Sequence, residues 1–214
     1  MLTLEDTTYN NEVVHRSKIF IQSNPNIPFY SLRAVFTSLM EQTFSEGRCF
    51  ESSSKENDQL WGYQIINFNA QQNDKSGVRN QKWYDKKVLN DTFYINQGKV
   101  LDGSSLLFRT RQKVGKAGQE QLKVVMDLDI GTTHIRYFDR IENVKIKAVK
   151  KPVKTYYIEG YNDWKALYGL GGKFEGWFSA DNARVPIKAQ MNVYLGSINI
   201  ELRKWKRVGW EPPI

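Results

Sequence analysis

The chain has 214 residues, of which 40% are hydrophobic and 25% are charged, and its formal net charge is +8. This composition excludes a disordered chain, a collagen-like repeat and a disulfide scaffold, since hydrophobic residues are plentiful and Cys49 is the single cysteine. Residues 1–100 hold 11 basic and 11 acidic side chains, so the whole positive excess lies in residues 101–214. An excess of positive charge on one part of a chain favours an anionic binding partner for that part.

Apolar and polar residues alternate with a period of two along most of the chain, which predicts strands. We expect strands at residues 12–22, 28–36, 44–52, 60–68, 92–96, 105–113, 120–130, 132–139, 144–148, 154–158 and 185–195. Turn-forming residues separate them, for example at 73–77, and residues 162–168 form at most a single helical turn. About a dozen short strands predict an all-β fold, as a sheet, a sandwich or an open barrel, in one domain over residues 1–214. No apolar run is long enough for a transmembrane helix.

The clearest local feature is a hairpin near the C-terminus. Gly196 and Ser197 separate two alternating runs, which predicts a two-residue type II′ turn. In this register Met191 lies opposite Leu202, so the apolar faces of the two strands coincide.

Motifs for catalysis are incomplete. Residues 169–173 resemble a phosphate-binding loop, but Phe174 stands where a serine or threonine is needed, so we interpret them as a glycine-rich loop between strands. His15 and His134 are isolated in sequence. Asp127 and Asp129 are expected on one face of a strand, either as a carboxylate pair for a cation or acid–base work, or as solvent-exposed residues. We therefore expect no enzyme activity, no metal site and no cofactor.

Two basic groups are candidates for binding a polyanion such as nucleic acid, anionic lipid or acidic polysaccharide. The alternative interpretation is that these lysines solvate the surface and protect sheet edges from aggregation. The first group has five lysines in ten residues, and the second surrounds Trp205 on an expected final strand. The candidates are Lys145, Lys147, Lys150, Lys151, Lys154, Arg203, Lys204, Lys206 and Arg207.

A C-terminal motif runs from Phe174 through Trp177, Asp181, Arg184 and Pro186 to Lys188 and is followed by Gly196-Ser197. It resembles the signature of the bacterial exported-protein domain-of-unknown-function family 3108, and residues 105–109 resemble the mid-domain element of that family. The resemblance implies a periplasmic or outer-membrane-associated protein of the cell envelope, and a large antiparallel meander sheet curled into a half-open or deformed β-barrel. It implies no assigned activity. Ala180 stands where many relatives carry a second acid.

The motif supplies four candidates for ligand binding, namely Trp177, Asp181, Arg184 and Lys188. The competing interpretation is architectural: Asp181-Asn182-Ala183 forms a turn, Arg184 pairs with Asp181, and Pro186 marks an edge strand or a bulge. The leading hypothesis is a non-enzymatic envelope protein that binds an apolar or glycan ligand or a protein partner. The alternative is a basic polyanion-binding β-module, with nucleic acid disfavoured by the envelope resemblance. A hydrolase ranks last, because it needs His134 beside an acid and a hydroxyl.

Overall fold

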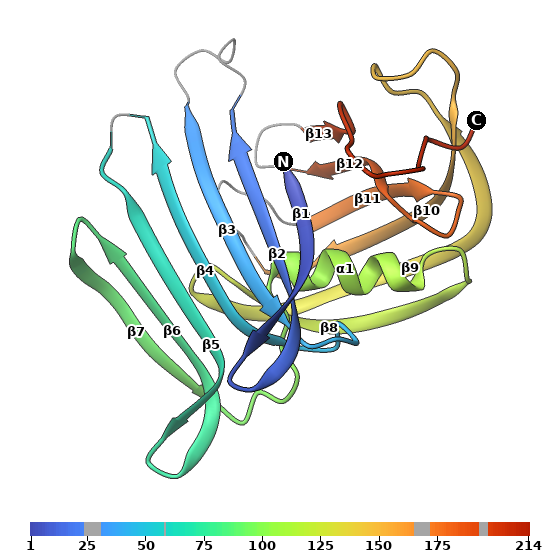
Figure 1. The fold of residues 1–214 in the computed structure, drawn as a ribbon. Helices are drawn as coiled ribbons and strands as arrows, with labels where there is room; N and C mark the ends of the chain where they lie inside the picture. The colour runs from blue at the N-terminus through green and yellow to red at the C-terminus, as the bar shows by residue number, and fades with distance from the viewer. Residues whose placement is uncertain (24–30, 58, 165–171, 193–196) are drawn as a thin grey trace. The chain divides into compact units, whose positions relative to one another are not determined.

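The computed structural model describes residues 1–23, 31–57, 59–164, 172–192 and 197–214. The chain divides into two compact units, Met1–Leu106 and Leu107–Ile214 (Figure 1). The single domain expected over residues 1–214 stays a prediction. Most of the expected glycine-rich loop and of the helical turn at 162–168 lies outside the described residues.

The first unit is a seven-stranded antiparallel meander in which every strand pairs with its neighbours in sequence. Alternate side chains enter its core, among them Val14, Met40, Ile66 and Val78. The predicted turn at 73–77 is confirmed at Asn73 and Asp74, which have φ of 49° and 60° and join two strands. The strands are β1 (Leu2–Tyr9), β2 (Glu12–Gln22), β3 (Leu32–Met40), β4 (Gly47–Glu56), β5 (Gly62–Gln72), β6 (Lys75–Tyr84) and β7 (Lys87–Ile95).

The strand expected at residues 105–113 is wrong, because this segment belongs to the helix α1 (Gly103–Lys113). Asp102 caps the helix: its Oδ1 accepts hydrogen bonds from the backbone N–H groups of Ser104 and Ser105 at 2.8 and 3.0 Å. Both serines are buried, so polar residues occupy core-facing helical positions and conceal the apolar periodicity of a helix. The apolar run that follows then resembles a strand.

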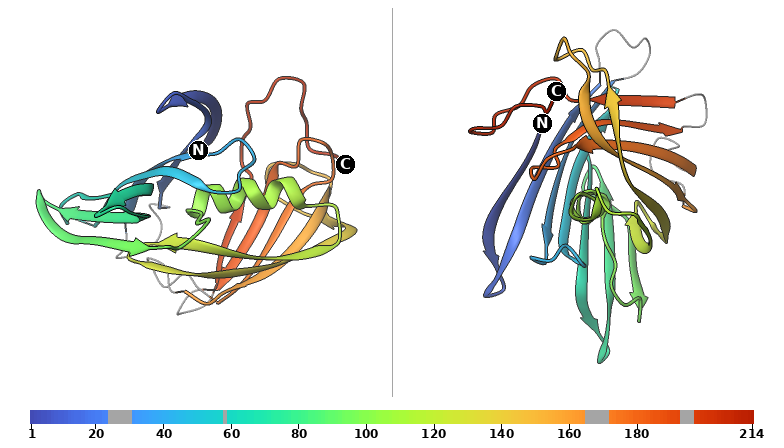
Figure 2. Two further views of the ribbon diagram at one scale, coloured as in Figure 1. Left: turned by 90° about the horizontal axis from the view of Figure 1, so that it is seen from below. Right: turned by 90° about the vertical axis from the view of Figure 1, so that its right-hand side faces the viewer.

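The second unit contains a six-stranded antiparallel sheet, which is also a meander (Figure 2). Its strands are β8 (Gly118–Met126), β9 (Asp129–Val144), β10 (Val153–Asn162), β11 (Gly172–Ser179), β12 (Pro186–Asn192) and β13 (Ser197–Glu201). Both sheets are open, as expected of a half-open or deformed barrel, and the described residues contain one helix. The all-β antiparallel fold class is therefore confirmed.

Asp127 and Asp129 do not share a strand face. Strand β8 ends at Met126, which pairs with Asp129, and Asp127 lies in the two-residue turn of the hairpin with φ of 52°. An aspartate adopts this left-handed conformation more readily than most residues. The apolar alternation runs unbroken through the turn, which explains why the sequence pattern concealed it.

The C-terminal hairpin forms in another register. Met191 pairs with Ile198, and Ala189 pairs with Ile200, whereas Leu202 was the partner expected for Met191. The shift is an even number of residues, so apolar side chains still face apolar side chains, and alternation alone does not distinguish the two registers. Residues 193–196 lie outside the described residues. Strand β13 ends at Glu201, so the final strand expected to carry Arg203 and Trp205 is wrong.

The C-terminal half of α1 is anchored on the second sheet. Arg109 Nη2 donates to Glu120 Oε1 at 2.7 Å, and the hydroxyl of Tyr137 donates to the other oxygen of Glu120 at 2.8 Å. Gly115 follows the helix with φ of 84°, the left-handed conformation that commonly ends a helix. This anchoring determines where the last helical turn, with Arg111 and Gln112, meets the rest of the unit. No helix in the described ranges is long and apolar enough to cross a membrane.

Candidate functional site

Trp177 and Lys188 lie opposite each other on β11 and β12. The ammonium group of Lys188 is 5.5 Å from the centroid of the Trp177 ring, and the indole N–H donates to Glu142 Oε2 at 3.0 Å. The ring of Tyr157 also packs against the ring of Trp177, with ring centroids 5.5 Å apart. The ring and the polar atom of Trp177 are therefore both engaged within the sheet.

Asp181 and Arg184 lie in the turn between β11 and β12. Asp181 Oδ1 accepts hydrogen bonds from the Ser179 hydroxyl and from the backbone N–H groups of Ala183 and Arg184, at 2.8, 2.9 and 3.0 Å. Its Oδ2 accepts a hydrogen bond from the indole N–H of Trp210 at 2.8 Å. Burial alone raises the pKa of Asp181, but these hydrogen bonds outweigh it and lower the pKa below its ordinary value. The carboxylate therefore organises the turn, as the architectural interpretation predicts.

The side chain of Arg184 does not complete the expected pair with Asp181. Its Nη1 donates to the carbonyl oxygen of Gln112, at the end of α1, at 2.7 Å. In return Arg111 donates from Nε and Nη2 to the carbonyl oxygen of Ala183, at 3.1 and 2.8 Å. This reciprocal pair of contacts joins the last turn of the helix to the motif and holds Arg184 at φ of 46°. Sequence reasoning missed Arg111, because 72 positions separate it from its partner Ala183.

The first lysine group lies in the loop between β9 and β10, and only Lys154 is on a strand. The expected strand at 144–148 is therefore wrong beyond Val144. Lys145, Lys147, Lys150 and Lys151 are exposed, and among the described side chains they make no ion pair. Lys154 Nζ instead donates to the backbone oxygen of Ile214 at 2.9 Å.

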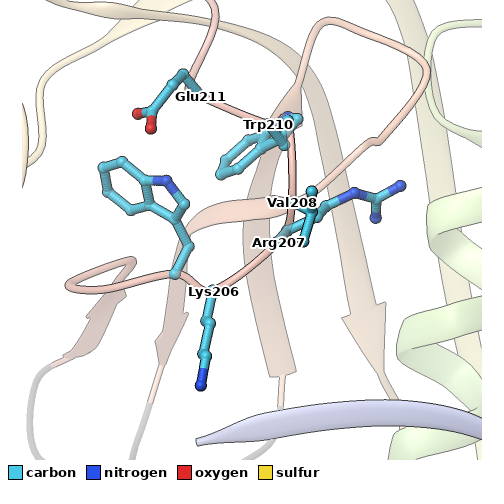
Figure 3. Close-up of a pocket in the computed structure, with 7 residues that line it drawn as sticks. Lys206, Arg207, Val208, Trp210 and Glu211 are labelled. Atoms are coloured by element: carbon cyan, nitrogen blue, oxygen red, sulfur yellow. The ribbon is translucent and has the colours of Figure 1, made fainter.

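The second basic group lies on the irregular segment that follows β13. Arg203 is 3.5 Å from Glu201, whereas Lys204, Lys206 and Arg207 are exposed. The same segment lines a pocket of about 310 Å³ formed by residues 205–211. Figure 3 shows Lys206, Arg207 and Glu211 pointing away from one another around this pocket. None of the four ligand-binding candidates from the motif lines it.

A small apolar cluster brings the two basic groups together. Ile146 from the lysine loop, Ala183 from the turn and Trp210 from the C-terminal segment are buried in one cluster with Val153 and Ile187. Trp205 packs against the same cluster and contacts Trp210 edge to face, with ring centroids 5.8 Å apart. Because its apolar residues turn inward, each segment presents its basic side chains outward. We call residues 145–154, 181–187 and 201–211, together with Arg111, the basic end of the second unit.

The electrostatics of the basic end are strongly one-sided. It contains eleven basic residues against three acidic ones, Asp181, Glu201 and Glu211. The pKa of Arg111 is lowered, first by burial and then by the neighbouring charges of Arg207 and Arg184, while Asp181 opposes the shift. Burial is the larger cause of this lowered pKa, and the two neighbouring positive charges add to it.

The structure does not gather all four motif candidates. Trp177 and Lys188 contact each other, and Asp181 and Arg184 share the turn, but within the described residues no hydrogen bond, ion pair or ring contact joins the two pairs. His15 is 2.6 Å from Asp6 and stacks on Phe44. His134 lies opposite Gln121 and Tyr161. The described part of the chain holds no cluster of three or more metal-ligating side chains.

Comparisons of the chain with protein-family models, with curated proteins and with solved structures each produced no match. The resemblance of the C-terminal motif to an exported-protein family therefore stays a prediction.

Proposed function

We propose that the protein is a non-enzymatic binding module for polyanions and that it binds them through the basic end of the second unit. The observation that carries this proposal is the packing of the lysine loop and the C-terminal basic segment around one apolar cluster. Residues that are about 50 positions apart in sequence thus contribute to one strongly positive region. Edge protection, the competing interpretation of the lysines, requires them on strands, and four of the five lie in a loop.

The basic side chains of this region have few internal counter-charges. Arg203 pairs with Glu201, and the carboxylate of Asp181 accepts hydrogen bonds from uncharged donors. A flexible chain of phosphates, sulfates or carboxylates can therefore replace the small counterions around the basic side chains, and their release drives binding. Such binding weakens steeply as the salt concentration rises.

Retention on a heparin column tests the proposal. A triple variant, Lys147→Ala with Lys150→Ala and Lys151→Ala, is expected to elute at clearly lower salt than the wild type. It should reduce the slope of log K against log salt by up to about 2–3, roughly one for each lost contact. The matched control removes three exposed lysines of the first unit, Lys75, Lys86 and Lys87, and should elute like the wild type.

Two results would contradict the proposal. If the two triple variants elute at the same salt, retention reflects net charge and the basic end is not the binding surface. If the wild type is not retained at low salt, the proposed function is wrong.

We also propose that the protein acts in the cell envelope. The support is the resemblance of residues 174–188 to the exported-protein signature. Finding the full-length gene product in the cytoplasmic fraction of its host would overturn this second proposal.

A further inference from the structure

Three arginines from three parts of the chain lie at or near the Asp181 turn. Arg111 comes from α1 and donates to the carbonyl of Ala183, and Arg184 follows Ala183 directly. Arg207 reaches the turn through Trp210: the backbone N–H of Trp210 donates to the carbonyl of Arg207 at 3.2 Å, while its indole donates to Asp181. The guanidinium groups of Arg111 and Arg184 are therefore held at the turn by hydrogen bonds, whereas Arg207 is joined to it through its backbone carbonyl.

Much of the hydrogen-bonding capacity of these arginines is unused. A guanidinium carries five N–H donors. In the described structure Arg111 donates from Nε and Nη2 to a single carbonyl oxygen, and Arg184 donates from Nη1 alone. In the part of the chain that the structure describes, none of the three arginines takes part in an ion pair. The other N–H groups of these partly exposed arginines can donate to an external acceptor.

The positive charges of the three arginines are also incompletely balanced by acidic side chains. Asp181 favours the charged form of Arg111, but both of its oxygens already accept hydrogen bonds. Arg207 and Arg184 both disfavour the charged form of Arg111, which is half-buried. An oxyanion placed among the three would relieve this repulsion and accept several charge-assisted hydrogen bonds at once.

We propose that Arg111, Arg184 and Arg207 form a discrete site for one tetrahedral oxyanion group, phosphate or sulfate. Tetrahedral groups offer several oxygens to the planar guanidinium forks, which bind them in a bidentate way. This inference rests on the proposed function, because the group can be carried by a bound polyanion. It can equally be supplied as a free inorganic ion, and the two sources share the same chemistry.

Arg207 is the residue to change, because its side chain is exposed, whereas Arg111 and Arg184 hold the turn and the helix together. The probe is inorganic phosphate, and then sulfate, titrated at constant ionic strength against chloride, with calorimetry and tryptophan fluorescence as readouts. We expect saturable one-to-one binding by the wild type. Arg207→Gln should weaken it about tenfold or more, and Arg207→Lys several-fold, because lysine keeps the charge but loses the fork. Arg33→Gln, which changes an exposed arginine of the first unit outside the basic end, is the matched control and should bind like the wild type.

Heparin retention, measured on the same variants, separates this inference from the proposed function. Retention of Arg207→Lys near the wild-type salt concentration, with weakened phosphate binding, supports a discrete site within a polyanion-binding surface. Retention without saturable phosphate binding, or equal weakening by Arg33→Gln and Arg207→Gln, overturns the discrete site and leaves the proposed function standing. Saturable phosphate binding without retention supports the site for a free ion and overturns polyanion binding. Displacement of heparin by phosphate at constant ionic strength would show that the polymer's own groups occupy the site.

Discussion

Replacing Asp181 tests the central claim that one carboxylate organises the motif turn. Four hydrogen bonds converge on it, from Ser179, two backbone amides and the indole of Trp210. At about 1 kcal/mol for each bond, Asp181→Ala should lower the free energy of unfolding by about 4 kcal/mol. This corresponds to a fall in Tm of roughly 8–16 °C for a chain of this size. Asp181→Asn keeps the oxygen that serves the turn but presents an amide to Trp210, so it should cost only about 1–2 kcal/mol.

The pH dependence gives an independent check. The folded-state pKa of Asp181 is lowered, so its stabilising contribution is present above its unfolded pKa and is lost as the pH falls through the folded pKa. The difference between the wild type and Asp181→Asn should therefore be largest at neutral pH and should shrink below about pH 4. Urea unfolding followed by tryptophan fluorescence measures both effects. If both variants unfold within about 0.5 kcal/mol of the wild type, or if the difference does not depend on pH, the carboxylate does not organise the turn.

Three further predictions concern other parts of the fold. Burial raises the pKa of Asp102, so its ionisation destabilises the folded state as the pH rises. The stability of Asp102→Asn relative to the wild type should therefore increase between pH 4 and 8. A difference in the free energy of urea unfolding that stays constant over this range would contradict the prediction. Gly115→Ala should lower the free energy of unfolding by about 2 kcal/mol in the same assay, because φ is 84° and the new Cβ would lie 2.9 Å from the ring of Tyr156. Gly98→Ala, at a φ of 70° with open space around the new Cβ, is the control and should lower it by less. Burial raises the pKa of Cys49 from 9.0 to about 11. At pH 8 a thiol reagent should therefore react about 100-fold more slowly with the folded than with the unfolded protein, and equal rates would show that the thiol is accessible.

Local patterns in the sequence were sufficient to predict most strands. The period of two follows from the geometry of a single strand, and β2 occupies the same residues, Glu12–Gln22, that the alternation predicts. Local patterns were misleading where other structure imitates a strand. The helix α1 places Ser104 and Ser105 in the core, and Asp127 turns the chain without interrupting the alternation. The register of the last hairpin was also undetermined, because a shift by an even number of residues preserves the apolar faces.

By itself, the sequence determined the strand-rich fold class, the basic character of the second half and the residues of the motif turn. These properties depend on composition, on strand periodicity and on the backbone preferences of aspartate and asparagine. Only the tertiary structure decided that Arg111 contacts Ala183 across 72 positions and that the lysine loop meets the C-terminal segment. The physical reason is that burial of Ile146, Ala183 and Trp210 in one cluster is a property of long-range packing, which no local pattern specifies.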